Sequence, residues 1–177
     1  MANTTYRDFS VNVKAALNDI SIGWLYEVAG EIEAQAKRNC KMATDGEHEG
    51  RELRGSYRYT VNEDKGEARI GSARESAYWE EFGTGSYADH SANGGKQGRQ
   101  GWWVYVKNGD KHSPNGGQTY QTQQEAEAIA QSMRDDGLDA YATNGREPNY
   151  TLQKGFKRVT PRAEEELAER LKEGLGE

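Results

Sequence analysis

Apolar side chains recur at intervals of three or four residues between about Lys14 and Met42. This spacing places them on one face of an α-helix. The face consists of Leu17, Ile20, Trp24, Val28, Ile32, Ala36 and Cys40. The next segment, Thr44 to Gly50, holds two glycines among acidic and polar residues, which is typical of a loop. We therefore expect a long first helix that ends near residue 42.

Alternation of apolar and polar residues replaces the helical period in the next part of the chain. Between Leu53 and Val61 the apolar side chains occupy odd positions, which predicts a half-buried strand. Asn62 to Gly66 then indicates a hairpin turn. Glu67 to Ser72 indicates the returning strand, with Ala68 and Ile70 facing inward, and Tyr78 to Phe82 follows as a third strand or a short helix. The short connections predict an antiparallel meander.

The segment from Gly83 to Gly101 is polar and rich in glycine, with no apolar period. We expect a long mobile loop at about 83–101. Loops of this length are uncommon in compact domains unless they bind something, so this one indicates a partner. Gly101 to Val106 is then strand-like, and Asn108-Gly109 indicates a turn.

Two further helices are predicted in the last third of the chain. Tyr120 to Asp136 is amphipathic, begins near Thr122 and stops at Gly137; a short strand, Leu138 to Thr143, follows it. Tyr150 to Leu171 is the last helix, and Pro161 is expected to kink or restart it. Its apolar face consists of Leu152, Phe156, Val159, Ala163, Leu167 and Leu171. The predicted fold is α+β: a small antiparallel sheet packed against the long first helix and the last helix.

Composition limits the size of the core and the kind of partner. A chain of 177 residues with 34% hydrophobic content and a mean hydropathy of -1.05 predicts one domain, residues 1–177, with a modest core. Ten tyrosines and four tryptophans exceed what such a core needs, and these residues are enriched at protein interfaces. We therefore expect oligomerisation. The net charge of -6 disfavours tight nonspecific binding to nucleic acid and to anionic membranes.

Signals for membrane insertion and for redox chemistry are missing from the sequence. There is no apolar run of the roughly 20 residues that a membrane span needs, and Met1 to Ser10 does not have the form of a signal peptide. The single cysteine, Cys40, is predicted to be a small core residue.

Residue patterns that indicate catalysis are also missing, so we predict that the protein is not an enzyme and uses no cofactor or metal. His48, His90 and His112 are isolated in polar stretches, which is typical of solvated loop histidines. Glu80 and Glu81 are adjacent and would point to opposite faces of a strand, so they are expected to be solvated or interface charges. Gly83 and Gly85 do not belong to a phosphate-binding loop, because no lysine or third glycine follows in the required place.

The order of short phrases along the chain resembles a known family of virion proteins. These phrases are AKRNC, GRELRGSYRYTV, ARIGS, AYWEEFGTG and GWW. They resemble the lambdoid gene-product-ten-like head-tail connector and tail-completion family of tailed phages, whose members carry phrases like APVDTGxLRxS, xIGT and YAxYVEFGTG. The matching residues are Gly50, Leu53, Arg54, Ser56, Ile70, Gly71, Ser72, Ala77, Tyr78, Glu81, Phe82, Gly83, Thr84 and Gly85. Lys41 to Glu49 and Tyr78-Trp79 depart from the family's phrases, whereas YATNGREPNYTLQKGF is similar to its ending.

This resemblance implies a structural role in the neck of a virion. Such proteins form a homo-oligomeric ring, expected to be a hexamer, that joins head-connector to tail-tube proteins and lets genome DNA pass without specific binding. The resemblance thus implies assembly in the bacterial host cytoplasm and a place in the virion neck or tail, with no membrane partner. The candidate contacts to subunits and partners are Trp79, Glu81, Phe82, Gly83, Thr84, Gly85, Tyr87, Arg99, Trp102 and Trp103.

Three alternatives stay open at the level of sequence. Trp79 and Phe82 fit the core of the sheet as well as an interface. The acidic run Glu164-Glu165-Glu166 with Glu169 fits a channel lining or a solvated helix face. Residues at about 118–144 would be an insertion in the family scaffold, and their pattern is also similar to the helix-turn-strand of a peptidoglycan-binding repeat. The pattern consists of Ala126, Ala130, Met133, Gly137, Leu138 and Ala140. The rival function is therefore that of a cell-wall binding module.

Overall fold

The fold is α+β, as predicted, with long helices and small antiparallel sheets. The computed structural model describes residues 10–41, 48–89, 99–107 and 118–175. Contacts group the chain into two compact units. The first unit consists of residues 1–74 and 151–177, and the second of residues 75–150. The predicted single domain thus consists of two units, each of which is described by itself below.

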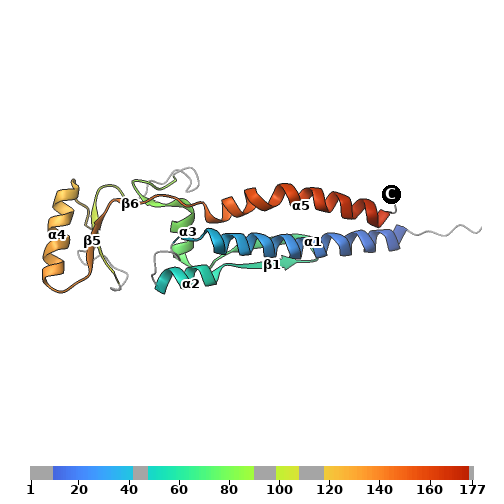
Figure 1. Ribbon diagram of the computed structural model, residues 1–177, viewed down its shortest axis with the longest axis horizontal. Helices are drawn as coiled ribbons and strands as arrows, with labels where there is room; N and C mark the ends of the chain where they lie inside the picture. The colour runs from blue at the N-terminus through green and yellow to red at the C-terminus, as the bar shows by residue number, and fades with distance from the viewer. Residues whose placement is uncertain (1–9, 42–47, 90–98, 108–117, 176–177) are drawn as a thin grey trace, which may run out of the picture. The chain divides into compact units, whose positions relative to one another are not determined.

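Two long helices, α1 (Ser10–Asn39) and α5 (Thr151–Leu175), lie side by side in the first unit (Figure 1). They run antiparallel, because Arg162 pairs with Glu31 at 2.8 Å and Arg170, two turns further on, pairs with Glu27 at 2.5 Å. Both predicted long helices are therefore confirmed. The helix α5 continues through Pro161 without restarting.

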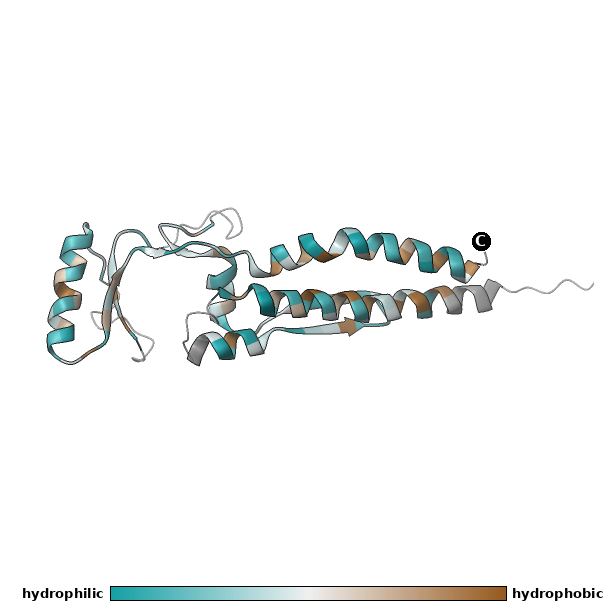
Figure 2. Cartoon of the chain, in the orientation of Figure 1, coloured by the Kyte–Doolittle hydropathy of each residue, from teal (hydrophilic) through white to brown (hydrophobic). Residues whose placement is uncertain are grey.

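The core of the first unit lies between these helices and is narrow. Ile32, Val159 and Ala163 are buried in it. The indole Nε1 of Trp24 donates a hydrogen bond of 2.7 Å to the carbonyl oxygen of Ala163. Figure 2 shows both helices as mostly hydrophilic with scattered hydrophobic positions, as the low mean hydropathy predicts. Cys40 is buried, as predicted, although it follows the last residue of α1 rather than lying within it.

A short helix, α2 (His48–Ser56), replaces the first half of the predicted strand at Leu53 to Val61. It also replaces the end of the loop predicted at Thr44 to Gly50, of which residues 44–47 lie outside the described residues. Gly50, Leu53 and Tyr57 are all buried. Their spacing of three and four residues fits one face of a helix as well as the alternation fits a strand. A helix forms here, so the strand prediction was wrong for Leu53 to Ser56.

The predicted hairpin is confirmed. Strands β1 (Arg58–Asn62) and β2 (Glu67–Gly71) pair antiparallel, with Tyr59 opposite Ile70 and Val61 opposite Ala68. The turn is closed by a hydrogen bond from Gly66 N to Glu63 O. Ala68 and Ile70 are half-buried, and Ile70 packs against the core of the first unit, so the inward face was predicted correctly. The hairpin makes no larger sheet, because the described strands form three separate two-stranded sheets. The predicted meander was therefore wrong.

Glu33 of α1 joins this hairpin to the helix. Its Oε2 accepts a hydrogen bond of 2.8 Å from the backbone N–H of Tyr59, and its Oε1 pairs with Lys37 at 2.6 Å. Burial by itself raises the pKa of Glu33, but the bonds from Lys37 and Tyr59 outweigh it and hold the pKa below its ordinary value.

The Glu33→Gln variant is expected to be less stable than the wild type by about 1 kcal/mol at neutral pH, because a neutral amide accepts a weaker bond from Tyr59. A carboxyl group whose pKa is lowered by folding stabilises the fold above its unfolded pKa, near 4.3. That contribution is lost as the pH falls through the lower, folded pKa. Urea unfolding from pH 7 to pH 3 should therefore show the two proteins converging in acid. Asp19→Asn, at an exposed carboxylate on the same helix, is the control, and a difference that persists unchanged at pH 3 would contradict this account.

The second unit contains α3 (Glu75–Phe82), α4 (Gln123–Asp135) and two small sheets. One sheet pairs β3 (Thr84–Gly85) with β6 (Gly145–Arg146), and the other pairs β4 (Trp103–Val106) with β5 (Ala140–Thr143). α4 begins with a capping box between Thr122 and Glu125, as the predicted start near Thr122 requires. The helix predicted at Tyr120 to Asp136 and the short strand predicted after it are thus both confirmed.

The core of the second unit lies between α4 and one face of the β4–β5 sheet. The buried residues are Val104, Ala126, Ala130 and Ala140, and α4 runs beside β5 in Figure 1. Alanines at the contact allow the helix to approach the strands closely. Because α4 covers one face, the side chains that alternate with Val104 point to the other face of the sheet.

Candidate partner-binding groove

A cavity of about 660 Å³ in the second unit is walled by aromatic side chains from two elements. Tyr78, Trp79 and Phe82 come from α3, and Trp103 and Tyr105 come from β4. We call this cavity the aromatic groove. Its volume falls within the range of about 300–1,000 Å³ that is typical of ligand sites. Such sites also have mainly apolar walls with a few polar groups, as this groove does.

The wall from α3 decides between a strand and a short helix, which the sequence had left open at Tyr78 to Phe82. Tyr78 to Phe82 forms a helix, so Trp79 and Phe82 are not core residues of a sheet. Trp79 is 42% exposed, while Phe82 is half-buried and packs on Tyr78 with 5.0 Å between ring centroids. The interface interpretation of Trp79 therefore fits its exposure.

The wall from β4 is the uncovered face of the β4–β5 sheet. Tyr105 stacks on Tyr141 across the two strands with 5.6 Å between ring centroids, and both rings are substantially exposed. Trp103 is half-buried and lies on the same face, opposite Thr143. A half-covered sheet with large aromatic rings on its open face has the composition of an interface core.

The Gly83-Thr84-Gly85 turn joins the two walls and leaves no room for larger residues. Gly85 has a φ of +61°, and a Cβ there would lie 2.2 Å from the Asn144 carbonyl oxygen and 2.6 Å from the Trp103 ring. A Cβ at Gly83 would lie 2.6 Å from the Arg146 carbonyl oxygen. Thr84 Oγ1 accepts a hydrogen bond of 3.0 Å from the Arg146 N–H. These contacts hold the shape of the groove before any partner binds.

A buried carboxylate fixes the polar side of the groove. Glu80 is fully buried; its Oε1 accepts a hydrogen bond of 2.9 Å from Asn149 Nδ2, and its Oε2 lies 3.4 Å from an Arg146 guanidinium nitrogen. Arg146 is partly exposed and lines the groove, so Glu80 orients a cation toward the cavity. Glu80 and Glu81 were expected to be solvated or interface charges, but both are buried, because α3 turns them inward.

Two further charged residues line the groove. The guanidinium of Arg99 lies 5.3 Å from the centroid of the Trp103 ring, in cation–π geometry. Asp89 accepts a hydrogen bond of 3.1 Å from the hydroxyl of Tyr150. Burial and this bond raise the pKa of Tyr150, which therefore remains a donor to Asp89 at neutral pH.

The structure brings most of the predicted contact residues together. Trp79, Phe82, Gly83, Thr84, Gly85, Arg99 and Trp103 line the groove. Three others do not. Glu81 is buried, Tyr87 is exposed outside the lining, and Trp102 packs on the core beneath α4. Sequence reasoning missed Tyr105, although its place two residues after Trp103 on a strand was a usable signal; Asp89 and Arg146 gave no local signal.

Several predictions fall wholly or partly outside the described residues. They are His90, His112, the turn at Asn108-Gly109 and the middle of the loop predicted at 83–101. His48 begins α2 rather than lying in a loop. Within the described ranges, no group of three His, Cys, Asp or Glu side chains could hold a metal ion. In that same part of the chain, no helix combines the length and the apolar character that a membrane span needs.

The groove therefore offers aromatic contact area, two guanidinium groups and a rigid turn, a combination suited to binding another molecule. A comparison with protein-family models, curated proteins and solved structures gave no match to this chain.

Proposed function

We propose that this protein is a structural component of a tailed-phage virion, a ring in the neck that joins head to tail and lets DNA pass. One observation carries the proposal. The Phe82 to Gly85 phrase, on which the family resemblance chiefly depends, lines an open aromatic groove, with Phe82 and Thr84 half-buried. A surface of this kind supports a role in assembly.

The surfaces that a closed ring of subunits requires support the same role. A ring of identical subunits needs two different surfaces on each copy, which meet head to tail and close by rotation. The aromatic groove supplies one such surface, since exposed Trp and Tyr are the residues most enriched where proteins associate. Its partners would be further copies of the chain and the neighbouring head-connector and tail-tube proteins.

The charge of the chain suits a channel through which DNA passes. The net charge of -6 disfavours a tight grip on a duplex, because a cationic lining would bind phosphates. Glu164, Glu165 and Glu169 on α5 are exposed, whereas Glu166 pairs with Arg162 at 3.1 Å. These exposed carboxylates fit the lining of the channel as well as they fit a solvated helix face.

The direct test is imaging and mass measurement of the purified protein, followed by imaging of particles. We expect a closed ring, six-membered by the family resemblance, with a central channel, and density at the junction of head and tail in virions. A protein that stays monomeric at high concentration, together with particles that lack such density, would overturn the proposal.

The Trp79→Ser variant should weaken ring formation by about tenfold or more while leaving the subunit folded, because the indole is 42% exposed in the isolated chain. Analytical ultracentrifugation measures the association, and thermal unfolding checks the fold. Leu138→Ser is the matched control, since Leu138 is 45% exposed in the same unit but does not line the groove. Equal effects of both changes would remove the groove from the subunit contact.

A cell-wall binding module remains the second candidate, and one observation favours it. The helix-turn-strand that resembles a peptidoglycan-binding repeat does form, with α4 packed on β5. Sedimentation with purified peptidoglycan sacculi distinguishes the two candidates. Retention of the wild type on the sacculi, together with the absence of rings, would favour the module.

A further inference from the structure

We propose that the aromatic groove of one copy receives the tip of the β1–β2 hairpin of the next copy. This inference rests on the proposed ring and names the surface that meets the groove. The hairpin tip consists of Val61 to Glu67, which belongs to the first unit, whereas the groove belongs to the second. Each copy thus carries both halves of a head-to-tail contact.

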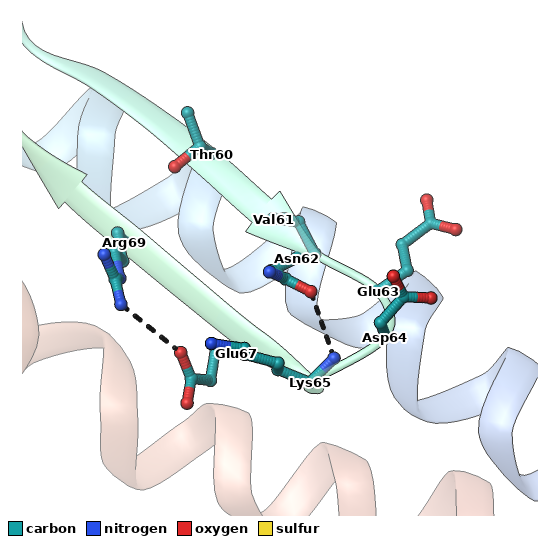
Figure 3. Close-up of a pocket in the computed structure, with 8 residues that line it drawn as sticks. All are labelled: Thr60, Val61, Asn62, Glu63, Asp64, Lys65, Glu67 and Arg69. Carbon is teal, nitrogen blue, oxygen red and sulfur yellow. Dashed lines mark hydrogen bonds and ion pairs between the residues drawn. The ribbon is translucent and has the colours of Figure 1, made fainter.

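The hairpin tip has a fixed shape of its own. The backbone N–H of Lys65 donates a hydrogen bond of 3.1 Å to Asn62 Oδ1, and Gly66 N donates one of 3.2 Å to Glu63 O. Figure 3 shows the Glu63 and Asp64 side chains extending from the end of the hairpin. A turn that these bonds already order loses little conformational entropy when it enters a preformed groove.

The surface beside the tip carries two aromatic rings. Tyr26 of α1 is 40% exposed, donates a hydrogen bond of 2.8 Å to Glu63 Oε1, and meets the Tyr59 ring edge-on at 6.4 Å between centroids. Asp64 is exposed at the apex of the turn. The surface beside the tip can therefore place an aromatic ring and a carboxylate against a partner together.

The charges of the two surfaces are complementary. Within the described residues, Arg99 makes a cation–π contact with Trp103 and no ion pair. Arg146 is held at the groove by buried Glu80. The tip offers Glu63 and Asp64, since Glu67 already lies 3.7 Å from Arg69. A second pair has the reverse arrangement, with a cation, Lys65, on the tip and an anion, Asp89, at the groove. Complementary charges of this kind set the register of a contact and suppress wrong partners.

Two single-site variants test the docking by complementation. Asp64→Arg removes the matching charge of the tip and leaves the groove intact; Arg99→Asp does the reverse. Each variant alone is expected to lose ring formation, with the dissociation constant of the subunit contact raised about tenfold or more. In a mixture, the tip of each variant faces a groove of opposite charge on the other variant, so ultracentrifugation should show rings in which the two variants alternate. Thermal unfolding confirms that each variant is folded.

A double variant and a control complete the design. Asp64→Arg combined with Arg99→Asp in one chain restores opposite charges across the contact and should recover rings. Asp19→Arg reverses an exposed charge on α1 and should leave rings unchanged. Rings that persist in Asp64→Arg, or a double variant without recovery, would overturn the docking and leave the proposed function standing, with a segment of another protein as the occupant of the groove. A wild type without rings would overturn the proposed function itself.

Discussion

Replacing Gly85 by alanine is expected to lower the free energy of unfolding of the second unit by about 3 kcal/mol or more, from a strained left-handed backbone and from overpacking. The added Cβ would lie 2.2 Å from the Asn144 carbonyl oxygen and 2.6 Å from the Trp103 ring, with φ held at +61°. Backbone and an indole cannot both move aside without opening the pairing of β3 with β6. The variant should therefore lose the groove along with stability.

The matched control is Gly137→Ala in the same unit. Gly137 also has a positive φ, +85°, but a Cβ there would meet nothing within 4 Å. Gly137→Ala should lower the free energy of unfolding by only about 1 kcal/mol, from the left-handed backbone alone. Urea unfolding measures both variants, and hydrogen exchange of the Arg146 amide, which is bonded to Thr84, reports the pairing directly. Equal losses in the two variants would show that the close contacts at Gly85 are relieved at little cost.

Replacing Glu80 by alanine is expected to lower the free energy of unfolding by about 3 kcal/mol, because it removes a fully buried side chain and the acceptor of the Asn149 amide. Glu80 is fully buried, and its loss would deprive Asn149 Nδ2 of its acceptor and Arg146 of its counter-ion. The backbone N–H of Asn149 also bonds to the carbonyl oxygen of Glu80, so the segment after β6 would lose a side-chain anchor beside this bond. Binding at the groove should weaken as well, because Arg146 would no longer be oriented.

Glu75→Ala on the same helix is the control for Glu80→Ala. Glu75 is exposed in the first turn of α3, and its removal should change the free energy of unfolding by less than about 0.5 kcal/mol. Chemical denaturation of both variants gives the comparison. A Glu80→Ala variant as stable as Glu75→Ala would mean that Glu80 adds no net stability, as happens for some buried ion pairs whose desolvation offsets their attraction.

The parts of the fold that the sequence predicted well are those with long or redundant local signals. α1 and α5 keep a helical period of apolar residues over many turns, and α4 adds a capping box at Thr122. The hairpin combines strand alternation with a polar, glycine-containing turn at Glu63 to Gly66. In α4 and the hairpin two independent local preferences indicate the same structure, and in α1 and α5 the helical period is sustained over many turns.

One error, at Leu53 to Ser56, and one alternative left open, at Tyr78 to Phe82, fall where the local signal is short and ambiguous. Leu53 and Tyr57 are compatible with both alternation and a helical spacing, and so is the aromatic run from Tyr78 to Phe82. In a segment of under ten residues, periodicity alone does not separate a strand from a helix. Burial of Leu53 in the first unit and of Glu80 in the second favoured the helix in both places.

By itself, the sequence determined the α+β class, the long helices, the hairpin and half of the residues that line the groove, because these follow from local periodicity and from turn-forming residues. Only the tertiary structure decided which side of the β4–β5 sheet would be open, and so separated Trp102 in the core from Trp103 in the groove. It also decided that Glu80 is buried. Its amide partner, Asn149, lies 69 residues away, and the free energy of burying a carboxylate depends on such distant partners rather than on sequence neighbours.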